Sequence, residues 1–593
     1  MKTRPNPFAL IVLMSLLLAA PAAWAADPAV LSQIPADAEL VVVTQPLNIV
    51  SAKLDLFARV VGIPLPENQP FKIEDALADL IGIPGVIDGS QSFAFAIVDL
   101  KKTESTMLGF LPVADAQAVL QEQAAQKVAD MPGVWQLPDK EDVFLKPASK
   151  YLVVAQQGQA LLGLDTKPKG FKLTPADSQL LAQSEALALI KLGPVIPELQ
   201  EQILQEMASN DDIQKHPGLK KVITMALDRL AELEKVTLAA SVGKGGIKLT
   251  INSLARPDST LAKYLTNHPT TNIAPLAKLP ASNFVTAAAY RLDSKAFQEP
   301  VFAVLDALAQ EITQDDQDVS AQMKQVKDLI SHMYELSLSD AVSQALYVSQ
   351  TPPSASPGLR ALEVTSFKNA QETLADAQKL LPLLSSLIEK AGYKLPMHYR
   401  AAVGKVDGLN YDEISLDLSQ LPLPEEALMA LAQQWGGQAA ITEQVCLLDS
   451  ERLAVAMGQA SLQEVVNLAK TKPAGLDQDP GIAHAAANLS SPANALAFIN
   501  VGNYLQMMMS QMMTVGPQGG INPMMMFMPL LEQIKGTVGI SATMNIGSVA
   551  AEVFIPAELI AGGYKAYMQM MMQMTQPPQV EPPSEPNQSE STL

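Results

Sequence analysis

The chain contains two stretches that begin alike, and this internal similarity restricts the architectures open to it. Residues 31–57 (LSQIPADAELVVVTQPLNIVSAKLDLF) combine a proline-containing start, an apolar run and an amphipathic segment, and the stretch opening at Leu276 (LAKLPASNFVTAAAYRLDSKAF) follows the same plan. Further on, residues 186–193 (ALALIKLG) share five of eight positions with residues 495–502 (ALAFINVG). Self-similarity of this kind predicts two copies of one folding unit.

Two further pairs of segments occur in the same order in both halves. The apolar run 151–155 precedes the tripeptide Gly-Gln-Ala at 158–160, and the apolar run 452–456 precedes the same tripeptide at 458–460. Near the end of each half the same three residue types recur with equal spacing, as Lys235, Thr237 and Ser241 and as Lys535, Thr537 and Ser541. We therefore predict a first repeat lobe over residues 26–270 and a second over residues 271–574, with a linker near 266–278.

The two ends of the chain are predicted to lie outside these lobes. Lys2 and Arg4 precede an apolar run at residues 8–20 and a small-residue site at 23–25, which is the pattern of a secretory signal peptide spanning residues 1–25. The apolar run is too short to span a bilayer, so we expect an exported protein, periplasmic or extracellular, with no transmembrane segment after cleavage. Residues 575–593 are rich in Pro, Glu and Ser and are predicted to be a disordered tail.

Apolar periodicity predicts an α+β fold, in which each lobe is a curved antiparallel sheet with amphipathic helices packed on one face. Strands are expected at residues 40–44, 92–100, 107–113 and 151–155, and helices at 47–61, 115–128 and 219–233. The helix at 219–233 is expected to pack on a closing hairpin that turns at Gly243–Gly246, and a second turn is expected at Asp407–Gly408. The rhythm is not that of regular βαβ units, so a parallel sheet is not expected.

Charge and cysteine content exclude some classes of function. The formal net charge of −20 disfavours binding to nucleic acids and to anionic lipid surfaces. Cys446 is the only cysteine, so an intramolecular disulfide cannot form and the fold must depend on apolar burial. The apolar neighbours of Cys446 predict an inert core thiol in a buried strand.

The sequence offers no strong catalytic or metal-binding pattern. The five histidines are widely separated and none has a second ligand at metal-binding spacing, so we expect no cofactor and no His- or Cys-based metal site. Ser241 and Lys244 fit the S-x-x-K spacing of some serine hydrolases, but that chemistry needs the serine at a helix start, whereas these residues fall at the predicted hairpin turn. We expect a turn here, and a serine hydrolase is kept only as a second alternative.

Methionine is the one unusual feature, because 14 of the 26 methionines occupy residues 507–528 and 568–574. Flexible thioether side chains fill irregular cores, but they also form adaptable surfaces for apolar ligands or protein segments. Leu505, Met508, Met509, Met512 and Met513 lie at helical spacing and are expected to form a buried apolar stripe. The methionines that fall off this stripe are candidates for such a contact surface: Met507, Met524, Met525, Met526, Met570 and Met574.

Capture of Cu(I) by three thioethers on one helix face is the alternative for the same region. Met509, Met512 and Met513 have the required spacing, although no His or Cys lies nearby to strengthen such a site.

A family resemblance rests on three short motifs. The sequence Ile34-Pro35-Ala36-Asp37 before an apolar run, the stretch FLPVADAQAVL from Phe110, and the closing segment at residues 553–556 (VFIP) resemble a loose group of large exported bacterial proteins of unknown function. The resemblance implies export and supplies no functional residues. Together with the features above, it predicts a non-catalytic binding or scaffold protein of the bacterial cell envelope, with a Met-mediated Cu(I)-binding protein as the alternative.

Overall fold

A computed structural model places strands and helices in both halves of the chain. It describes residues 28–65, 70–102, 106–138, 140–164, 170–209, 217–266, 268–291, 298–309, 317–336, 342–348, 359–390, 396–421, 425–435, 440–458, 462–471, 474–515 and 533–575. The predicted signal peptide therefore lies outside the described residues, as do residues 576–593 of the predicted tail and Met524, Met525 and Met526.

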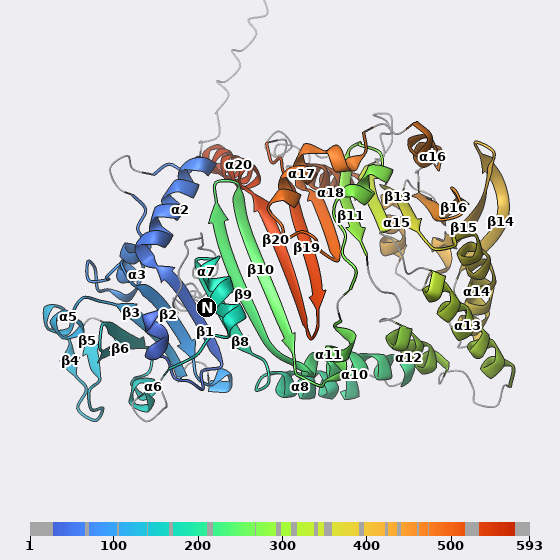
Figure 1. Cartoon of the computed structure of the whole chain (residues 1–593). Helices are drawn as coiled ribbons and strands as arrows, with labels where there is room; N and C mark the ends of the chain where they lie inside the picture. Colours follow the sequence, from blue (N-terminus) through green and yellow to red (C-terminus); the bar gives the residue numbers. More distant parts are fainter. Residues whose placement is uncertain are drawn as a thin grey trace, which may run out of the picture.

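The described strands differ in length and form one wholly antiparallel sheet, in agreement with the predicted α+β class. Each strand pairs with the next in the order β4, β5, β6, β7, β3, β2, β1, β8, β9, β10, β20, β19, β18, β11, β12, β13, β17, β16, β15, β14. Figure 1 shows the long strands β9, β10, β20 and β19 side by side across the middle of the molecule. The two halves of the chain thus meet at the pairing of β10 with β20.

The strands of the first half have the following bounds: β1 Leu40–Pro46, β2 Ser92–Ile97, β3 Met107–Pro112, β4 Gln126–Lys127, β5 Trp135–Leu137, β6 Lys140–Ala148, β7 Tyr151–Ala155, β8 Ala186–Lys191, β9 Leu233–Gly243 and β10 Gly246–Ala255. Those of the second half are β11 Phe284–Tyr290, β12 Val342–Val348, β13 Leu359–Ser366, β14 Met397–Val406, β15 Leu409–Asp417, β16 Ala440–Leu447, β17 Arg452–Gly458, β18 Ala495–Asn500, β19 Thr537–Asn545 and β20 Ser548–Pro556.

The helices of the first half are η1 Ala29–Ser32, α2 Leu47–Val61, α3 Ile73–Ile81, η2 Leu100–Lys102, α5 Ala116–Glu122, α6 Gly158–Gly163, α7 Pro175–Ala182, α8 Ile196–Ser209, α10 Pro217–Ala231 and α11 Thr260–Tyr264. Those of the second half are η3 Ala274–Lys278, α12 Gln298–Ala309, α13 Gln317–Leu336, α14 Ala370–Lys390, η5 Leu418–Gln420, α15 Glu425–Gln434, α16 Leu462–Thr471, η6 Leu476–Gln478, α17 Pro480–Ala487, α18 Val501–Val515 and α20 Ala557–Thr575.

Local chemistry explains where several elements begin and end. Gly62 closes α2 in the left-handed conformation (φ 78°), which glycine adopts without a steric penalty. Asp115 caps α5 by accepting from the amides of Gln117 and Ala118, as predicted. The helix that we expected to reach residue 128 instead ends at Glu122, because the chain turns there and residues 126–127 pair as strand β4.

Strands β1, β2, β3 and β7 of the first half are buried on both faces, so the expectation of helices on one face only is wrong for this part of the sheet. On one face Phe95 packs in a core with residues of α2, α3 and α5. On the other face Ala94 and Ala96 pack in a second core with residues of η1, α6 and α7. The cause is visible in β2, whose sequence SFAFAI places phenylalanines on one face and alanines on the other, leaving neither face polar.

The described residues of the second half include a sheet core, a separate helical core and a small cluster around Met507. The sheet core joins buried residues of β11, β13, β17 and β18 to η3, α16 and α17. The helical core joins α12, α13 and α14, which lie at the right of Figure 1. Helix α10 contacts α8 and α12 as well as β9, so it lies beside other helices and does not rest on the hairpin alone.

The predicted linker is held against the second half of the chain. Leu276 in η3 is fully buried, and the side-chain amide of Asn494 donates to the carbonyl oxygens of His268 and Pro269, each at 2.9 Å. Thr271 forms a bridge with Ala493. These contacts fix the segment that we expected to be a plain connector.

A buried carboxyl group lies beside the central strands of the first half. Glu185 is 0 % exposed, its Oε2 accepts from the amide of Val242 at 3.5 Å, and its Oε1 lies 3.7 Å from Lys53 Nζ. Burial raises the pKa of this carboxyl to about 8, although the Lys53 ammonium opposes the shift. The ionised form is therefore disfavoured in the folded protein.

We predict that Glu185→Gln stabilises the protein in alkaline solution. Because the folded-state pKa is raised, the carboxyl contributes most to stability below its ordinary value of 4.5, and this contribution is lost as the pH rises through about 8. The glutamine amide does not titrate. The free energy of unfolding of Glu185→Gln should therefore exceed that of the parent protein by ~2–4 kcal/mol at pH 9 and differ little from it at pH 4.

Urea unfolding of both proteins at pH 4, 6 and 9 measures this difference. The matched control is Glu198→Gln, because Glu198 is a half-exposed carboxylate near Lys101 and its replacement should change the free energy of unfolding little. Equal stability of Glu185→Gln and the parent protein at pH 9 would contradict the assignment.

Candidate functional site

Of the six methionines predicted to form a contact surface, the structure describes the side chains of Met507 and Met570. Met507 in α18 is only 8 % exposed and packs with Val285 and Leu359, so its expected exposure is wrong. The reason is that α18 lies against β11 and turns Met507 inward, while Met508, assigned to the buried stripe, is 38 % exposed. Met509 is buried as expected.

The second methionine segment lies on the long C-terminal helix α20. Met570 is half-buried, and its neighbours Met571 and Met572 are 41 % and 57 % exposed. The side chain of Met574 lies outside the described residues. The contact surface therefore stays a prediction, and so does Cu(I) binding, because the side chains of Met512 and Met513 are likewise outside the described part.

A cavity of about 480 Å³ lies over the second-half sheet, on strands β18, β11, β12, β13 and β17. We call it the sheet-face cavity. Its lining is mostly apolar and includes Ala288, Gln344, Leu346, Glu363, Met457 and Ile499. Leu346 also packs against the cluster that contains Met507, so the cavity borders the methionine-rich helix α18.

The polar groups of the sheet-face cavity are few. Glu363 accepts from the hydroxyl of Thr365 at 2.5 Å. Burial, followed by the negative charge of Glu363, raises the pKa of Glu443 on the neighbouring part of the sheet. The same two causes raise the pKa of the Tyr290 phenol. The cavity therefore combines a predominantly apolar floor with one side of negative potential.

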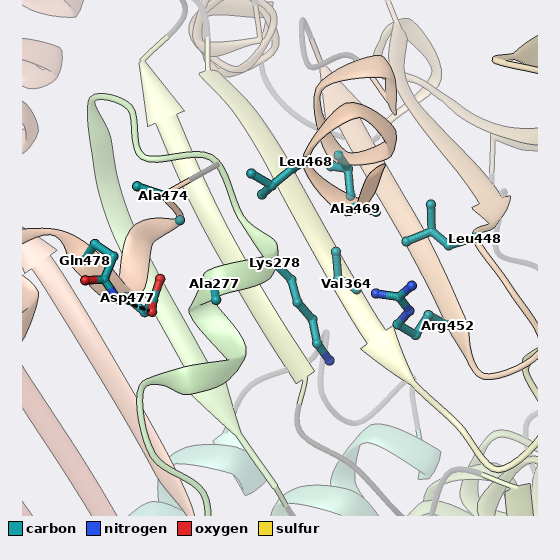
Figure 2. Close-up of a pocket in the computed structure, with 12 residues that line it drawn as sticks. Ala277, Lys278, Val364, Leu448, Arg452, Leu468, Ala469, Ala474, Asp477 and Gln478 are labelled. Carbon is teal, nitrogen blue, oxygen red and sulfur yellow. Dashed lines mark hydrogen bonds between the residues drawn. The ribbon is translucent and has the colours of Figure 1, made fainter. Parts of the chain in front are cut away.

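A second cavity, of about 440 Å³, lies between η3, η6, α16 and the strands β13 and β17 (Figure 2). We call it the η3–α16 cavity. Gly475 allows its walls to meet, because a side chain at this position would lie within 2.5 Å of the Ala277 backbone. The amide of Leu476 donates to the carbonyl of Leu279 at 3.0 Å and joins η6 to the end of η3.

Charged groups lie at both ends of the η3–α16 cavity. Lys278 Nζ donates to Ser366 Oγ at 2.9 Å, and Arg452 forms an ion pair with Asp449 at 2.5 Å. Figure 2 shows Lys278 and Arg452 on opposite sides of Val364, and Asp477 on the far side of Ala277. Asp477 Oδ2 accepts from its neighbour Gln478, but the buried Oδ1 has no hydrogen-bond partner among the described residues.

The residues considered for catalysis occupy structural positions. Ser241 lies within β9 and pairs with Lys248, and Lys244 lies in the turn that follows, as expected for a hairpin. Among the described residues, no group of three or more His, Cys, Asp or Glu side chains is arranged to hold a metal ion.

Neither cavity has a signature in the sequence. Glu363, Gln344, Lys278, Arg452 and Asp477 carry no motif, and the spacing of each along the chain is unremarkable. One signal was present, because the aligned strands 151–155 and 452–456 begin with tyrosine and with arginine respectively. A change from an aromatic to a charged residue at matching positions of a repeat indicates a different environment.

Comparisons with protein-family models, curated protein sequences and solved structures find no match to this chain. In the described part of the chain, no helix has the length and apolar character needed to cross a membrane.

We predict that Cys446 resists thiol reagents in the native protein. The side chain is 0 % exposed in β16, and burial raises its pKa to about 11, so the reactive thiolate is scarce at pH 8. Ellman's reagent should label less than a tenth of the thiol in the time that suffices for complete labelling in 6 M guanidinium chloride. Complete labelling of the native protein at a comparable rate would show that the strand opens readily.

Proposed function

We propose that this chain is an exported, non-catalytic binding protein of the bacterial cell envelope, composed of two related α+β lobes. In this proposal the first lobe is a filled scaffold and the second lobe holds an apolar ligand in the sheet-face cavity. Met507 of α18, which shares a cluster with Leu346 of the cavity lining, then serves as a deformable border of that cavity, and this deepens the earlier expectation of an adaptable contact surface.

The order of strand pairing supports two related lobes. From its outer edge to the junction the first half reads β4, β5, β6, β7, β3, β2, β1, β8, β9, β10, and the second half has the same order with each strand number raised by ten. A shared and non-trivial topology is what duplication of one unit produces.

Equivalent positions can be assigned from the strand registers, starting from the matched segments at residues 186–193 and 495–502. By this register Glu185 corresponds to Asn494, since each immediately precedes the matched strand. Both side chains are fully buried, and they accept hydrogen bonds from the equivalent amides of Val242 and Met544. A buried polar contact retained at one position of each half supports a common origin.

The single observation that carries the proposal is a row of side chains on one face of the sheet. In the first half the row crosses five neighbouring strands and the core beneath it is filled, whereas in the second half the same row lines the cavity. The first row is Ala188, Val42, Phe95, Gly109 and Val154. The second row is Ala497, Ala288, Gln344, Glu363 and Val455.

Two differences between these rows account for the cavity. Phe95 is fully buried beneath helices in the first half, and its equivalent Gln344 is exposed. Val42, which contacts the same core, is replaced by the smaller Ala288. The sheet-face cavity has a volume of about 480 Å³ and a mainly apolar lining. Small-molecule sites usually have volumes in this range, and the lining favours an apolar ligand.

The proposal is tested with the neutral apolar fluorophore N-phenyl-1-naphthylamine. The native protein should bind it with enhanced fluorescence, and Gln344→Phe should weaken binding at least ~tenfold, because the aromatic ring occupies the cavity as Phe95 occupies the equivalent space. Exposed Gln344 can be replaced without loss of a buried hydrogen bond, so the unfolding midpoint should change little.

The matched control is Met508→Ser, which alters an exposed methionine of α18 and should leave probe binding unchanged. Absence of binding to the native protein would overturn the proposal. Binding that survives Gln344→Phe but disappears when Met524, Met525 and Met526 are replaced by Ser would move the site to the methionine surface.

A further inference from the structure

In the described part of the chain, the lining of the sheet-face cavity contains one charged side chain. It belongs to Glu363 of β13, and the other described lining residues are neutral. Glu363 accepts from the hydroxyl of Thr365, the next residue on the same face of β13, at 2.5 Å. Directly across from Glu363 lie Gln344 on β12 and Val455 on β17. The carboxylate therefore lies at the floor of the cavity among uncharged neighbours.

A second carboxyl group lies on the same face of the sheet. Glu443 of β16 pairs with Met457 of β17, which in turn pairs with Ala361 of β13. Ala361 precedes Glu363 by two residues, so Glu443 and Glu363 project from the same face. Burial raises the pKa of Glu443, and the negative charge of Glu363 raises it further. The two carboxyl groups therefore lie near enough to repel each other.

The strands of this face supply no positive charge to balance the two glutamates. Strands β11, β12, β13, β16, β17 and β18 contain two basic residues, Arg360 and Arg452. Arg360 lies three residues from Glu363, and Arg452 three residues from Val455, so both arginines project from the opposite face. There each arginine forms an ion pair with another carboxylate. Within the described residues, neither Glu363 nor Glu443 forms an ion pair with a basic side chain.

The first half carries neither acid at the equivalent positions. By strand register Glu363 corresponds to Gly109, and Glu443 corresponds to Val143. Val143 packs against the core that covers this face of the first half. Two carboxyl groups on one partly dehydrated face disfavour each other's ionisation. Their presence in the half that holds the cavity, and not in the other, favours a role in binding.

We propose that the ligand of the sheet-face cavity is an amphiphilic organic cation, with an ammonium group and an apolar body. This inference rests on the proposed function and names the class of its ligand. The ammonium group lies beside Glu363, on the side of Glu443, and donates charge-assisted hydrogen bonds to the Glu363 carboxylate. The apolar body lies over Ala288, Leu346 and Ile499. An ammonium group near both glutamates relieves their repulsion, which a neutral or anionic ligand does not.

Isothermal titration calorimetry of the mature chain at neutral pH, with three eight-carbon probes, tests the ligand class. Octylammonium should bind at one site per chain and at least ~tenfold more tightly than 1-octanol, because only the ammonium forms a charge-assisted hydrogen bond with Glu363. Octanoate should bind more weakly than 1-octanol, because Glu363 repels its carboxylate.

The possible results separate the ligand class from the proposed function. Binding of N-phenyl-1-naphthylamine, together with equal affinity for octylammonium and 1-octanol, would keep an apolar site and overturn the ligand class. Binding of many octylammonium ions per chain without a single saturable site would assign them to the acidic surface and overturn it too. Lack of octylammonium binding would also overturn the ligand class, and lack of binding by N-phenyl-1-naphthylamine as well would overturn the proposed function.

Two nearly isosteric variants locate the ammonium group. Glu363→Gln keeps an acceptor for Thr365 and should reduce the preference for octylammonium over 1-octanol at least ~fivefold, with the affinity for 1-octanol unchanged. Glu443→Gln should reduce the preference less, because Glu443 lies beyond the cavity lining. The matched control is Glu198→Gln, which removes the same charge from the first half and should leave the preference unchanged. A preference that survives in Glu363→Gln, with an unchanged unfolding midpoint, would overturn the inference.

Discussion

The pairing of β10 with β20 is the contact on which the rest of the sheet depends, because it joins strands from opposite halves of the chain. Nine residue pairs connect the two strands, from Gly246 with Pro556 to Leu254 with Ser548. Thr250 and Glu552 form the middle pair of this ladder. Without this junction each half would expose a long strand edge with unpaired backbone groups, which is a site of aggregation.

The junction also explains why the two halves are not interchangeable. Glu552 accepts from the amide and hydroxyl of Ser490 and pairs with Lys248 of β10 at 3.3 Å. Its first-half counterpart in the middle pair is Thr250, which cannot make these contacts. Charge is thus present on one side of this interface only, and pairing of β20 with a second β20 in the same register would place two Glu552 carboxylates opposite each other, which disfavours that pairing.

The sequence was sufficient for most of the local structure and for none of the cavities. Periodicity and capping residues predicted α2 over residues 47–61, the hairpin at Asp407–Gly408 and the buried strand around Cys446, since each depends on neighbouring residues alone. The burial of Met507 was not predictable, because it depends on how α18 rotates against β11. The two cavities depend on which side chains meet across neighbouring strands. The register of strand pairing decides this, and the pattern of a single segment does not specify the register.

Under the proposed function, the two halves of one continuous sheet divide stability and binding between them, because one sheet face is covered in the first half and holds a cavity in the second. Phe95, Phe110 and Tyr151 fill both faces of the first half, and burying large apolar side chains is the main source of folding free energy. Replacing such residues by smaller or charged ones opens space at a cost that a small isolated domain cannot easily tolerate. Because β10 and β20 make one sheet of both halves, the strands that line the cavities are held in register by a neighbouring half with a buried core on each face. This arrangement allows the second half to carry Gln344 and Arg452 where a self-supporting sheet needs aromatic rings.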